Sequence, residues 1–295
     1  MHICKKKCTF AAAKVNSNKH DMRKSVFALV AAITVCLFTA CEPQEEPLAY
    51  WYPKKQLVEA FVSQYCGYCP AGMSAVYDFA HGDDNFVVIA HHYGFYEDNL
   101  SDGAGSAISN KLGVNGTPSA TINREKTTYY SRQAAVVFSP TYLPYTKKDQ
   151  FDDRAIACVD IQNSYDAASH RVTVNIHGRV SPSENPNLYL TVLIKESGMQ
   201  DFQNDYSISS HQWSVYRHTD AVRVFLTDPT GNEVTINEHR FFASYTYVLD
   251  SKWVPENCSV VAFISEGFDP IINANQAPVV KGTDGGNNYK PEGLK

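Results

Sequence analysis

The stretch QLVEAFVSQYCGYCP, residues 56–70, places two cysteines three positions apart directly after an apolar run of strand length. Residues 70–80 then carry apolar side chains at helical spacing, and residues 86–90, Phe-Val-Val-Ile-Ala, form a second apolar run. A strand, a helix and a strand in this order predict a parallel βαβ unit. We therefore expect an α/β domain at the start of the folded chain.

A proline turn follows this unit at the foot of another strand-like run. Gly116-Thr117-Pro118 precedes residues 119–122, and residues 101–112 predict a second helix. The cis form of an X-Pro bond costs only roughly 0.5 to 1 kcal/mol, and a cis turn leaves the Thr117 backbone free to pair with an extended peptide. The cysteines and Pro118 together resemble a thioredoxin-fold redox site. This resemblance implies a thioredoxin-like domain over residues 55–150, although its closing elements are not identifiable in the sequence.

The two cysteines predict redox chemistry, because a Cys-x-x-Cys pair can alternate between a dithiol and a small-loop disulfide. If a helix begins at their turn, its N–H groups and positive dipole end stabilise a thiolate on Cys66. Cys69 lies one turn deeper on the same face, where it can attack a mixed disulfide on Cys66. Cys66 is therefore the expected nucleophile and Cys69 the resolving thiol. The alternatives are a static disulfide or half of a zinc site, although the sequence holds no second Cys-x-x-Cys.

Three further side chains near the cysteines are candidates for the site. Glu59 lies in the strand before Cys66, where a buried carboxylate with a raised pKa can act as a base for Cys69; the alternative is an acid at an exposed strand edge. His91 and His92 end the second predicted strand, and are either buried by packing or close enough to bind a metal with the cysteines. We expect no cofactor and no resident metal. A copper-handling protein that uses Cys66, Cys69 and His92 is the weaker alternative.

Composition and charge limit the function classes. The chain has 295 residues, enough for two domains of ordinary size, and its 44% hydrophobic and 19% charged residues are typical of a soluble globular protein. The first 40 residues hold seven of the 26 Lys and Arg but one of the 31 Asp and Glu. The remainder is therefore acidic, and no nucleic-acid partner is expected.

The N-terminal segment has the pattern of an export signal. A mostly apolar stretch follows an Arg-Lys pair and ends in small residues directly before Cys41. Since it is shorter than the roughly 20 residues of a membrane-spanning helix, residues 1–40 predict a cleaved signal peptide, with Met22 as an alternative true start. Cys41 is then the expected lipidation site, and residues 41–54 the tether to a membrane. An incidental cysteine beside a conventional cleavage site is the alternative.

The second half of the chain has the alternating pattern of β-strands. Alternation is plainest in residues 172–177, Val-Thr-Val-Asn-Ile-His, and about seven short runs of this kind are separated by turn residues. This series predicts an immunoglobulin-like β-sandwich over residues 151–280 and a disordered tail over residues 281–295. Cys158 and Cys258 lie in two of the runs and are either a structural disulfide or two buried free thiols.

The site motif and the whole layout resemble known proteins. Cys66-Gly67-Tyr68-Cys69 with Thr117-Pro118 resembles the active site of the periplasmic disulfide isomerase DsbC. The signal, the cysteine segment, Thr117-Pro118, Asn123-Arg124 and a C-terminal β-domain are together similar to the outer-membrane-protein-twenty-eight-related lipoproteins of Bacteroidetes. This resemblance implies a lipoprotein of the cell envelope and outer membrane, periplasmic or surface-facing, of a kind sometimes discussed as an adhesin or receptor.

These patterns support two functions of different classes. The first is an envelope-anchored thiol-disulfide oxidoreductase, a reductase or an isomerase, whose partners are cysteine-containing exported proteins. The second is a non-catalytic, surface-exposed binding or adhesin lipoprotein in which the thioredoxin-like module is a scaffold. The direction of the redox chemistry does not follow from the motif, because known couples of this kind span roughly 150 mV.

Overall fold

The computed structural model describes residues 51–80, 82–93, 97–129, 132–182, 184 and 186–287. All of them belong to one compact unit, Leu48–Lys295. The predicted signal peptide, the alternative start Met22 and the predicted lipidation site Cys41 lie outside the described residues, as does most of the predicted tether.

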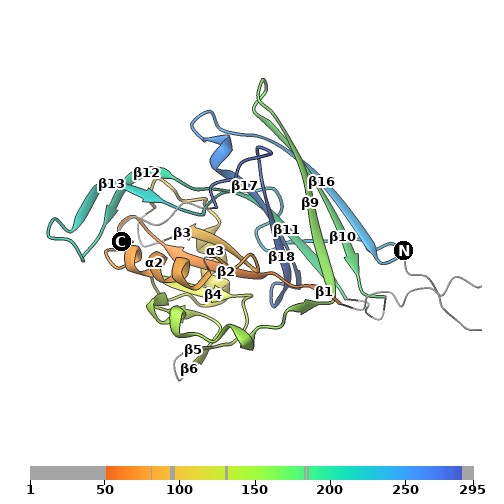
Figure 1. Cartoon of the computed structure of the whole chain (residues 1–295), viewed down its shortest axis with the longest axis horizontal. Helices are drawn as coiled ribbons and strands as arrows, with labels where there is room; N and C mark the ends of the chain where they lie inside the picture. Colours follow the sequence, from red (N-terminus) through yellow and green to blue (C-terminus); the bar gives the residue numbers. More distant parts are fainter. Residues whose placement is uncertain are drawn as a thin grey trace, which may run out of the picture. The chain divides into compact units, whose positions relative to one another are not determined.

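The first half of the described chain contains the predicted α/β unit (Figure 1). Strand β2 (Gln56–Val62) leads into helix α2 (Cys69–Ala80), and strand β3 (Phe86–His92) follows. β3 pairs with β2 in parallel, which confirms the predicted βαβ order. Helix α3 (Gly105–Leu112) and strand β4 (Ser119–Ile122) come next, and β4 runs antiparallel to β2 on its other side.

Short elements follow β4, where the sequence offers no identifiable closing helix. A proline opens the first 3₁₀ helix of this stretch, a position where the missing N–H costs little. The elements are β5 (Thr127–Tyr129) paired with β6 (Arg132–Ala134), β7 (Val137–Phe138) beside β4, the 3₁₀ helices Pro140–Tyr145 and Lys148–Gln150, and β8 (Arg154–Ala155) paired with β1 (Tyr52–Pro53).

Strands dominate the second half, so the fold as a whole is rich in β-structure. One short 3₁₀ helix, Pro255–Asn257, interrupts the strands there. The strands are β9 (Ala157–Asp166), β10 (Arg171–Val180), β11 (Leu188–Glu196), β12 (Met199–Asn204), β13 (Gln212–His218), β14 (Ala221–Phe225), β15 (Asn232–Glu233), β16 (Arg240–Val248), β17 (Cys258–Glu266) and β18 (Ile271–Pro278).

Two sheets enclose the core of the second half. Strands β16, β10 and β9 form a three-stranded antiparallel sheet in that order. Val172, Val174 and Ile176 of β10 are fully buried and belong to the same core cluster as Leu190 of β11 and Val260 of β17. The predicted alternation is therefore confirmed, because one face of β10 packs on the core and the other points away from it.

One nine-stranded sheet extends through both halves (Figure 1). Its order is β18-β17-β11-β14-β3-β2-β4-β7, with β15 beside β11. The halves meet at the parallel pair of β14 and β3, where Ala221 lies opposite Ala90 and the Ala90 N–H donates to the Asp220 carbonyl at 2.7 Å. The sheet therefore crosses the boundary predicted between residues 150 and 151, and a division into separate domains stays a prediction.

The two faces of β2 point into different parts of the core. Val58 and Ala60 share a cluster with side chains of α2, including Cys69. Leu57, at an alternating position, belongs to a cluster on the opposite face. Glu59 is in phase with Leu57, so its side chain points away from α2 and from the cysteines.

The prediction of a disordered tail is wrong for residues 281–287. Gly285 and Gly286 are buried, and the Ser259 hydroxyl of β17 donates to the Gly285 carbonyl at 3.0 Å. Gly and Asn residues favour disorder in a sequence, but glycine also allows the backbone to approach a strand closely. Residues 288–295 lie outside the described part of the chain.

Cys158 and Cys258 are free thiols, so the predicted disulfide between them is wrong. Cys258 lies in the core between the sheets, where burial raises the pKa of its thiol and its Sγ donates to the Val254 carbonyl at 3.3 Å. Cys158 alternates along β9 with the buried Ala157 and Val159. It therefore points to the other face of the three-stranded sheet, and the sheet itself separates the two sulfur atoms.

Candidate redox site

Cys66 and Cys69 form a disulfide at the start of α2. The turn between them closes with the Cys69 N–H donating to the Cys66 carbonyl at 3.1 Å. Cys69 is the first residue of the helix and is 2% exposed, whereas Cys66 is half-buried. The more accessible sulfur therefore precedes the helix and the buried sulfur lies in its first turn, as expected for a nucleophile and a resolving thiol.

The proline turn lies against the same helix. The Thr117–Pro118 peptide bond is cis, and the Pro118 ring packs so closely on Gly72 of α2 that a Cβ on Gly72 would lie 2.5 Å from the Pro118 Cβ. Gly72 is one turn after Cys69 on the helix. The structure thus places the predicted proline turn, Thr117–Pro118, against α2 within one turn of Cys69.

A β-hairpin from the second half packs on the cysteine loop. We call this hairpin the arm; it comprises β12, β13 and the residues between them, 199–218. Amide groups of the arm donate to backbone carbonyls on either side of Cys66, so the loop is built from two distant parts of the chain. The bonds run from Gln203 Nε2 to the Ser63 (3.1 Å) and Cys66 (3.0 Å) carbonyls, and from the N–H groups of Asn204 and Tyr206 to the Gln64 (2.8 Å) and Gly67 (2.9 Å) carbonyls.

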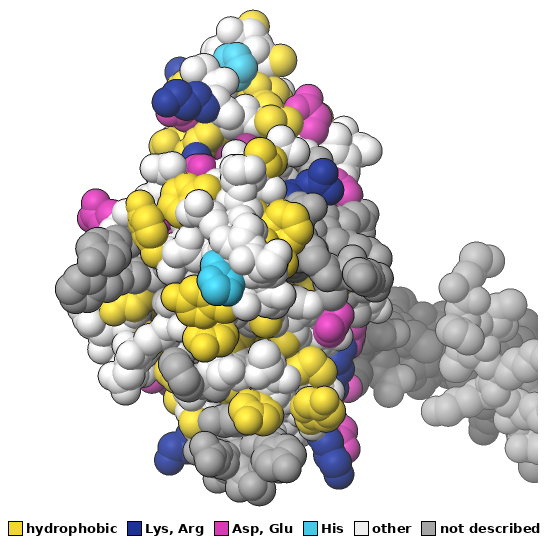
Figure 2. Space-filling view, turned by 90° about the vertical axis from the view of Figure 1, so that its left-hand side faces the viewer, with side chains coloured by type: hydrophobic (Ala, Val, Ile, Leu, Met, Phe, Trp, Pro, Cys, Tyr) yellow, Lys and Arg dark blue, Asp and Glu magenta, His cyan; other side chains and the backbone are white. Residues whose placement is uncertain are grey.

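Aromatic rings surround the disulfide at the surface. The Tyr206 ring lies over Gly67 and meets the Tyr68 ring edge-on, with centroids 5.1 Å apart. Tyr65, Tyr68 and Tyr206 are all exposed. Figure 2 shows the face that includes the arm: hydrophobic and uncharged polar side chains occupy its centre, and most charged side chains lie toward its margins. An extended peptide can stack on such rings without competing charges.

Replacing Gly67 by Ala is expected to displace the arm, because the new Cβ would lie 2.6 Å from the Tyr206 ring. Overpacking of this kind costs about 1 to 3 kcal/mol. Limited proteolysis should cut faster within residues 205–211, and urea unfolding should show the loss of stability. In a Tyr206→Ala background, which lacks the ring, Gly67→Ala should cost much less stability than it does in the unaltered protein. Equal losses in both backgrounds would contradict the contact.

A small cavity lies behind the disulfide. Cys69 and His92 both line it, together with His218 from the arm. His92 is buried, and its Nδ1 lies 3.0 Å from Asp98 Oδ2. Asp98 Oδ2 also accepts the Gln64 N–H at 2.9 Å, so the carboxylate is fixed in place. Of the two histidines predicted near the site, His92 therefore lines the same cavity as Cys69.

The charges around this cavity favour an ionised Asp98 and a neutral His218. Burial opposes ionisation of Asp98, but the hydrogen bond and charge of His92 and two backbone N–H groups outweigh it and lower its pKa. Burial, with the charge of His92 nearby, lowers the pKa of His218 to about 4. His218 Nε2 lies 3.3 Å from the Phe202 carbonyl. At neutral pH an uncharged imidazole and a carboxylate therefore flank His92.

Glu59 does not have the predicted role of a base for Cys69. It is fully buried on the opposite face of β2, where Arg124 Nε and Nη2 donate to its two oxygens at 2.7 and 2.9 Å. Burial raises its pKa, but Arg124 and His91 outweigh this and hold the pKa at about 2. Both sequence-based readings of Glu59 are therefore wrong, because strand parity places it in a buried ion-pair network.

His91 completes this network on the side of α3. Its Nε2 lies 3.2 Å from Glu59 Oε1, and its Nδ1 lies 3.5 Å from Asp102 Oδ2. Burial lowers the pKa of His91, but the hydrogen bonds and charges of Asp102 and Glu59 outweigh this and raise it to about 9. Two cations and two carboxylates thus balance, and the network joins β2, β3, the start of α3 and the turn after β4.

A family model described as outer membrane protein Omp28 matches residues 105–282, more than half of the chain. The chain belongs to the Omp28 outer membrane protein family. The predicted location in the outer membrane is therefore confirmed. No helix in the described part of this Omp28 family member is both long and apolar enough to cross a membrane. The described residues also contain no group of three or more His, Cys, Asp or Glu side chains arranged to hold a metal ion.

Solved structures give a likeness of fold. HBP35 of Porphyromonas gingivalis superposes with a TM-score of 0.64 over 83% of this chain and 79% of that chain, at 21% identity. A domain of the outer membrane lipoprotein Omp28 from Porphyromonas gingivalis gives a TM-score of 0.30 over 42% of this chain and 88% of that chain, at 15% identity. Curated proteins yield no match.

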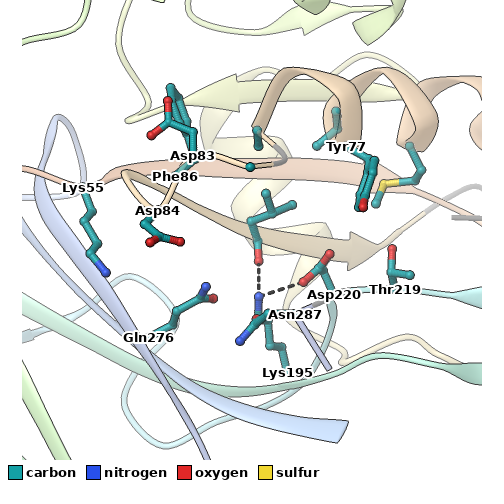
Figure 3. Close-up of a pocket in the computed structure, with 15 residues that line it drawn as sticks. Lys55, Tyr77, Asp83, Asp84, Phe86, Lys195, Thr219, Asp220, Gln276 and Asn287 are labelled. Atoms are coloured by element: carbon teal, nitrogen blue, oxygen red, sulfur yellow. Dashed lines mark hydrogen bonds and ion pairs between the residues drawn. The ribbon is translucent and has the colours of Figure 1, made fainter. Parts of the chain in front are cut away.

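A larger cavity of about 360 Å³ lies farther along α2 in this Omp28 family member, beside Met73, Val76 and Tyr77 (Figure 3). Lys195 of β11 is buried there, and its ammonium group donates to Asp220 Oδ1 at 2.7 Å and to the Val88 carbonyl of β3 at 2.9 Å. Figure 3 shows Lys195 and Asp220 facing each other. The hydrogen bond to the Val88 carbonyl therefore joins β11 of the second half to β3 of the first, and Asp220 balances the charge of the buried ammonium group.

The sequence did not indicate four residues of the site. Asp98, Gln203, Tyr206 and His218 lie in polar stretches that carry no motif. Gln203 donates hydrogen bonds to backbone carbonyl groups of a loop far away in the sequence. No pattern of neighbouring residues predicts such a contact. For the histidines the sequence did carry a signal. His91 and His92 are adjacent at the end of a predicted strand, so one of the two side chains has to point to the face on which the cysteines lie.

Proposed function

We propose that this Omp28 family member is an envelope-anchored thiol-disulfide oxidoreductase that acts on cysteines of exported proteins. In this proposal β2 to β4 form a thioredoxin-like module, and the two sheets of the second half form an immunoglobulin-like sandwich. The observation that carries the proposal is the Cys66–Cys69 disulfide at the start of α2, with Thr117–Pro118 packed on the same helix. A structural disulfide needs no such partner turn.

The two sulfurs are placed for two successive steps. In the reduced protein Cys66, the more accessible cysteine, attacks a substrate disulfide and forms a mixed disulfide. Cys69 then attacks Cys66 from within the first turn of α2 and releases the substrate thiol. Tyr65, Tyr68 and Tyr206 offer uncharged aromatic contact to the substrate chain beside the disulfide.

Attachment to the membrane is part of the same proposal. A lipid on Cys41 anchors the mature chain, and the residues between Cys41 and β1, where the fold begins, let the folded unit reach proteins that enter the envelope. The outer membrane location supports this arrangement, since disulfide chemistry belongs to oxidising compartments. The arm is the part of the β-rich half that contacts the substrate.

Reduction of insulin and refolding of scrambled ribonuclease test the activity. Cys66→Ser is expected to reduce both rates to background, whereas Cys158→Ser, which alters a half-buried free thiol outside the site, is expected to keep them. Activity of Cys66→Ser equal to that of the unaltered protein refutes the proposal and favours the non-catalytic binding function.

A trapping variant identifies the substrates. Cys69→Ala removes the resolving thiol, so mixed disulfides at Cys66 should accumulate in intact cells and separate under reducing conditions. The double variant with Cys66→Ser is the matched control and should trap nothing. An empty trap in Cys69→Ala cells would count against exported protein substrates.

A further inference from the structure

The cavity behind the disulfide has a volume of about 20 Å³, which is enough for one water molecule. Three side chains from separate elements share its wall: His92 of β3, His218 of β13, and Cys69 of α2, which carries a proton only when the disulfide is reduced. Tyr216 of β13 is the fourth titratable side chain there, and Asp98 reaches His92 from the loop after β3. The buried cysteine and two imidazoles thus line one cavity.

The hydrogen-bond partners fix which imidazole nitrogens carry protons. An ionised Asp98 can only accept, so His92 Nδ1 donates to it, and Nε2 is the ring nitrogen that this bond leaves open. The Phe202 carbonyl can likewise only accept, so neutral His218 donates from Nε2 and keeps its lone pair on Nδ1. Each ring therefore has one nitrogen left that can accept a proton.

We propose that His92, oriented by Asp98, accepts the thiol proton of Cys69 when Cys69 attacks the mixed disulfide on Cys66. This inference rests on the proposed function and assigns the proton acceptor that Glu59 cannot be, because Glu59 lies on the other face of β2. The proton passes to Nε2 directly or through one water in the cavity. Asp98 is a positioning residue, since it acts through His92.

The step balances without a further reactant. The Cys69 S–H bond breaks and its proton goes to His92 Nε2, while the sulfur forms a bond to Cys66 Sγ. The bond between Cys66 and the substrate sulfur breaks, and its electron pair leaves on the substrate sulfur, which takes up a proton from solvent. The protein pair is oxidised to a disulfide and the substrate is reduced to a thiol.

A single-turnover reaction with dithiobis-nitrobenzoate separates the two sulfurs. In a Cys158→Ser background, which lacks the half-buried free thiol, one thionitrobenzoate is released when Cys66 attacks and a second when Cys69 resolves the adduct, so stopped-flow absorbance gives two phases. In His92→Gln we expect an unchanged first phase and a second phase slowed about 100-fold at pH 7. The dependence of the second rate on pH should also differ from that of the unaltered protein.

Two further variants protect the test from misfolding. Asp98→Asn keeps the size of the side chain and should slow the second phase less than His92→Gln does. His177→Gln, on the exposed face of β10, is the matched control and should change neither phase. A second phase with unaltered rate and pH profile in both His92→Gln and Asp98→Asn overturns the inference. A missing first phase in the unaltered protein refutes the proposed function itself.

Discussion

Replacing Glu59 by Ala is expected to lower the free energy of unfolding by about 3 to 5 kcal/mol, because it leaves Arg124 as an unpaired buried cation. Arg124 is 3% exposed, and Glu59 is the one carboxylate to which it donates in the described part of the chain. Its other hydrogen bond there goes to the Phe268 carbonyl at 2.9 Å. His91 loses a partner as well. Urea unfolding followed by circular dichroism measures the change.

An exposed carboxylate provides the control for this prediction. Glu125 is 44% exposed and lies 3.7 Å from Lys54 Nζ, so Glu125→Ala should cost less than about 1 kcal/mol. A similar small loss for Glu59→Ala would show that the buried network contributes little to stability. The redox activity per folded molecule should stay unchanged in Glu59→Ala, since Glu59 points away from the cysteines.

The stability of the folded chain is expected to fall as the pH rises from about 6.5 to about 9. His91 has its pKa raised from 6.5 to about 9, so the folded state binds this proton more tightly than the unfolded state does. Its contribution is complete below pH 6.5 and is lost as the pH passes through 9. The loss is on the order of 3 kcal/mol. Unfolding free energies measured at several pH values test it.

Comparing the pH dependence of stability in the unaltered protein and in His91→Asn isolates the effect of His91. In His91→Asn the slope between pH 6.5 and 9 should disappear, although the variant is less stable at every pH in that range. His218 does not contribute to this slope. Its pKa is lowered to about 4, so its effect on stability is confined to pH values below 6.5. An unaltered slope in His91→Asn would assign the pH dependence to other groups.

The sequence alone predicts the part of the fold in which signals are local. The apolar runs of β2 and β3 and the helical spacing of α2 lie within a few residues of one another, and the βαβ order follows from them. Cys66, Cys69 and Thr117-Pro118 carry their chemistry in short motifs, and the structure places the proline turn against the helix that begins at Cys69. The alternation in β10 likewise reports one buried face.

The remaining parts depend on contacts between distant segments. The arm meets the cysteine loop through backbone carbonyls, which no side-chain pattern encodes. The position of Glu59 depends on which face of β2 meets α2, and a shift of one residue in a strand reverses that face. Cys158 and Cys258 fail to pair for the same reason, because each lies in a predicted strand but only Cys258 faces the core.

Strand β3 pairs on one edge with β2 and on the other with β14, which comes much later in the chain. This pairing constrains how the molecule assembles during secretion. An exported chain that emerges N-terminus first exposes one edge of β3 until residue 221 has followed. An unpaired strand in a crowded compartment is a template for wrong partners. We therefore expect that edge of β3 to need protection while the rest of the chain arrives.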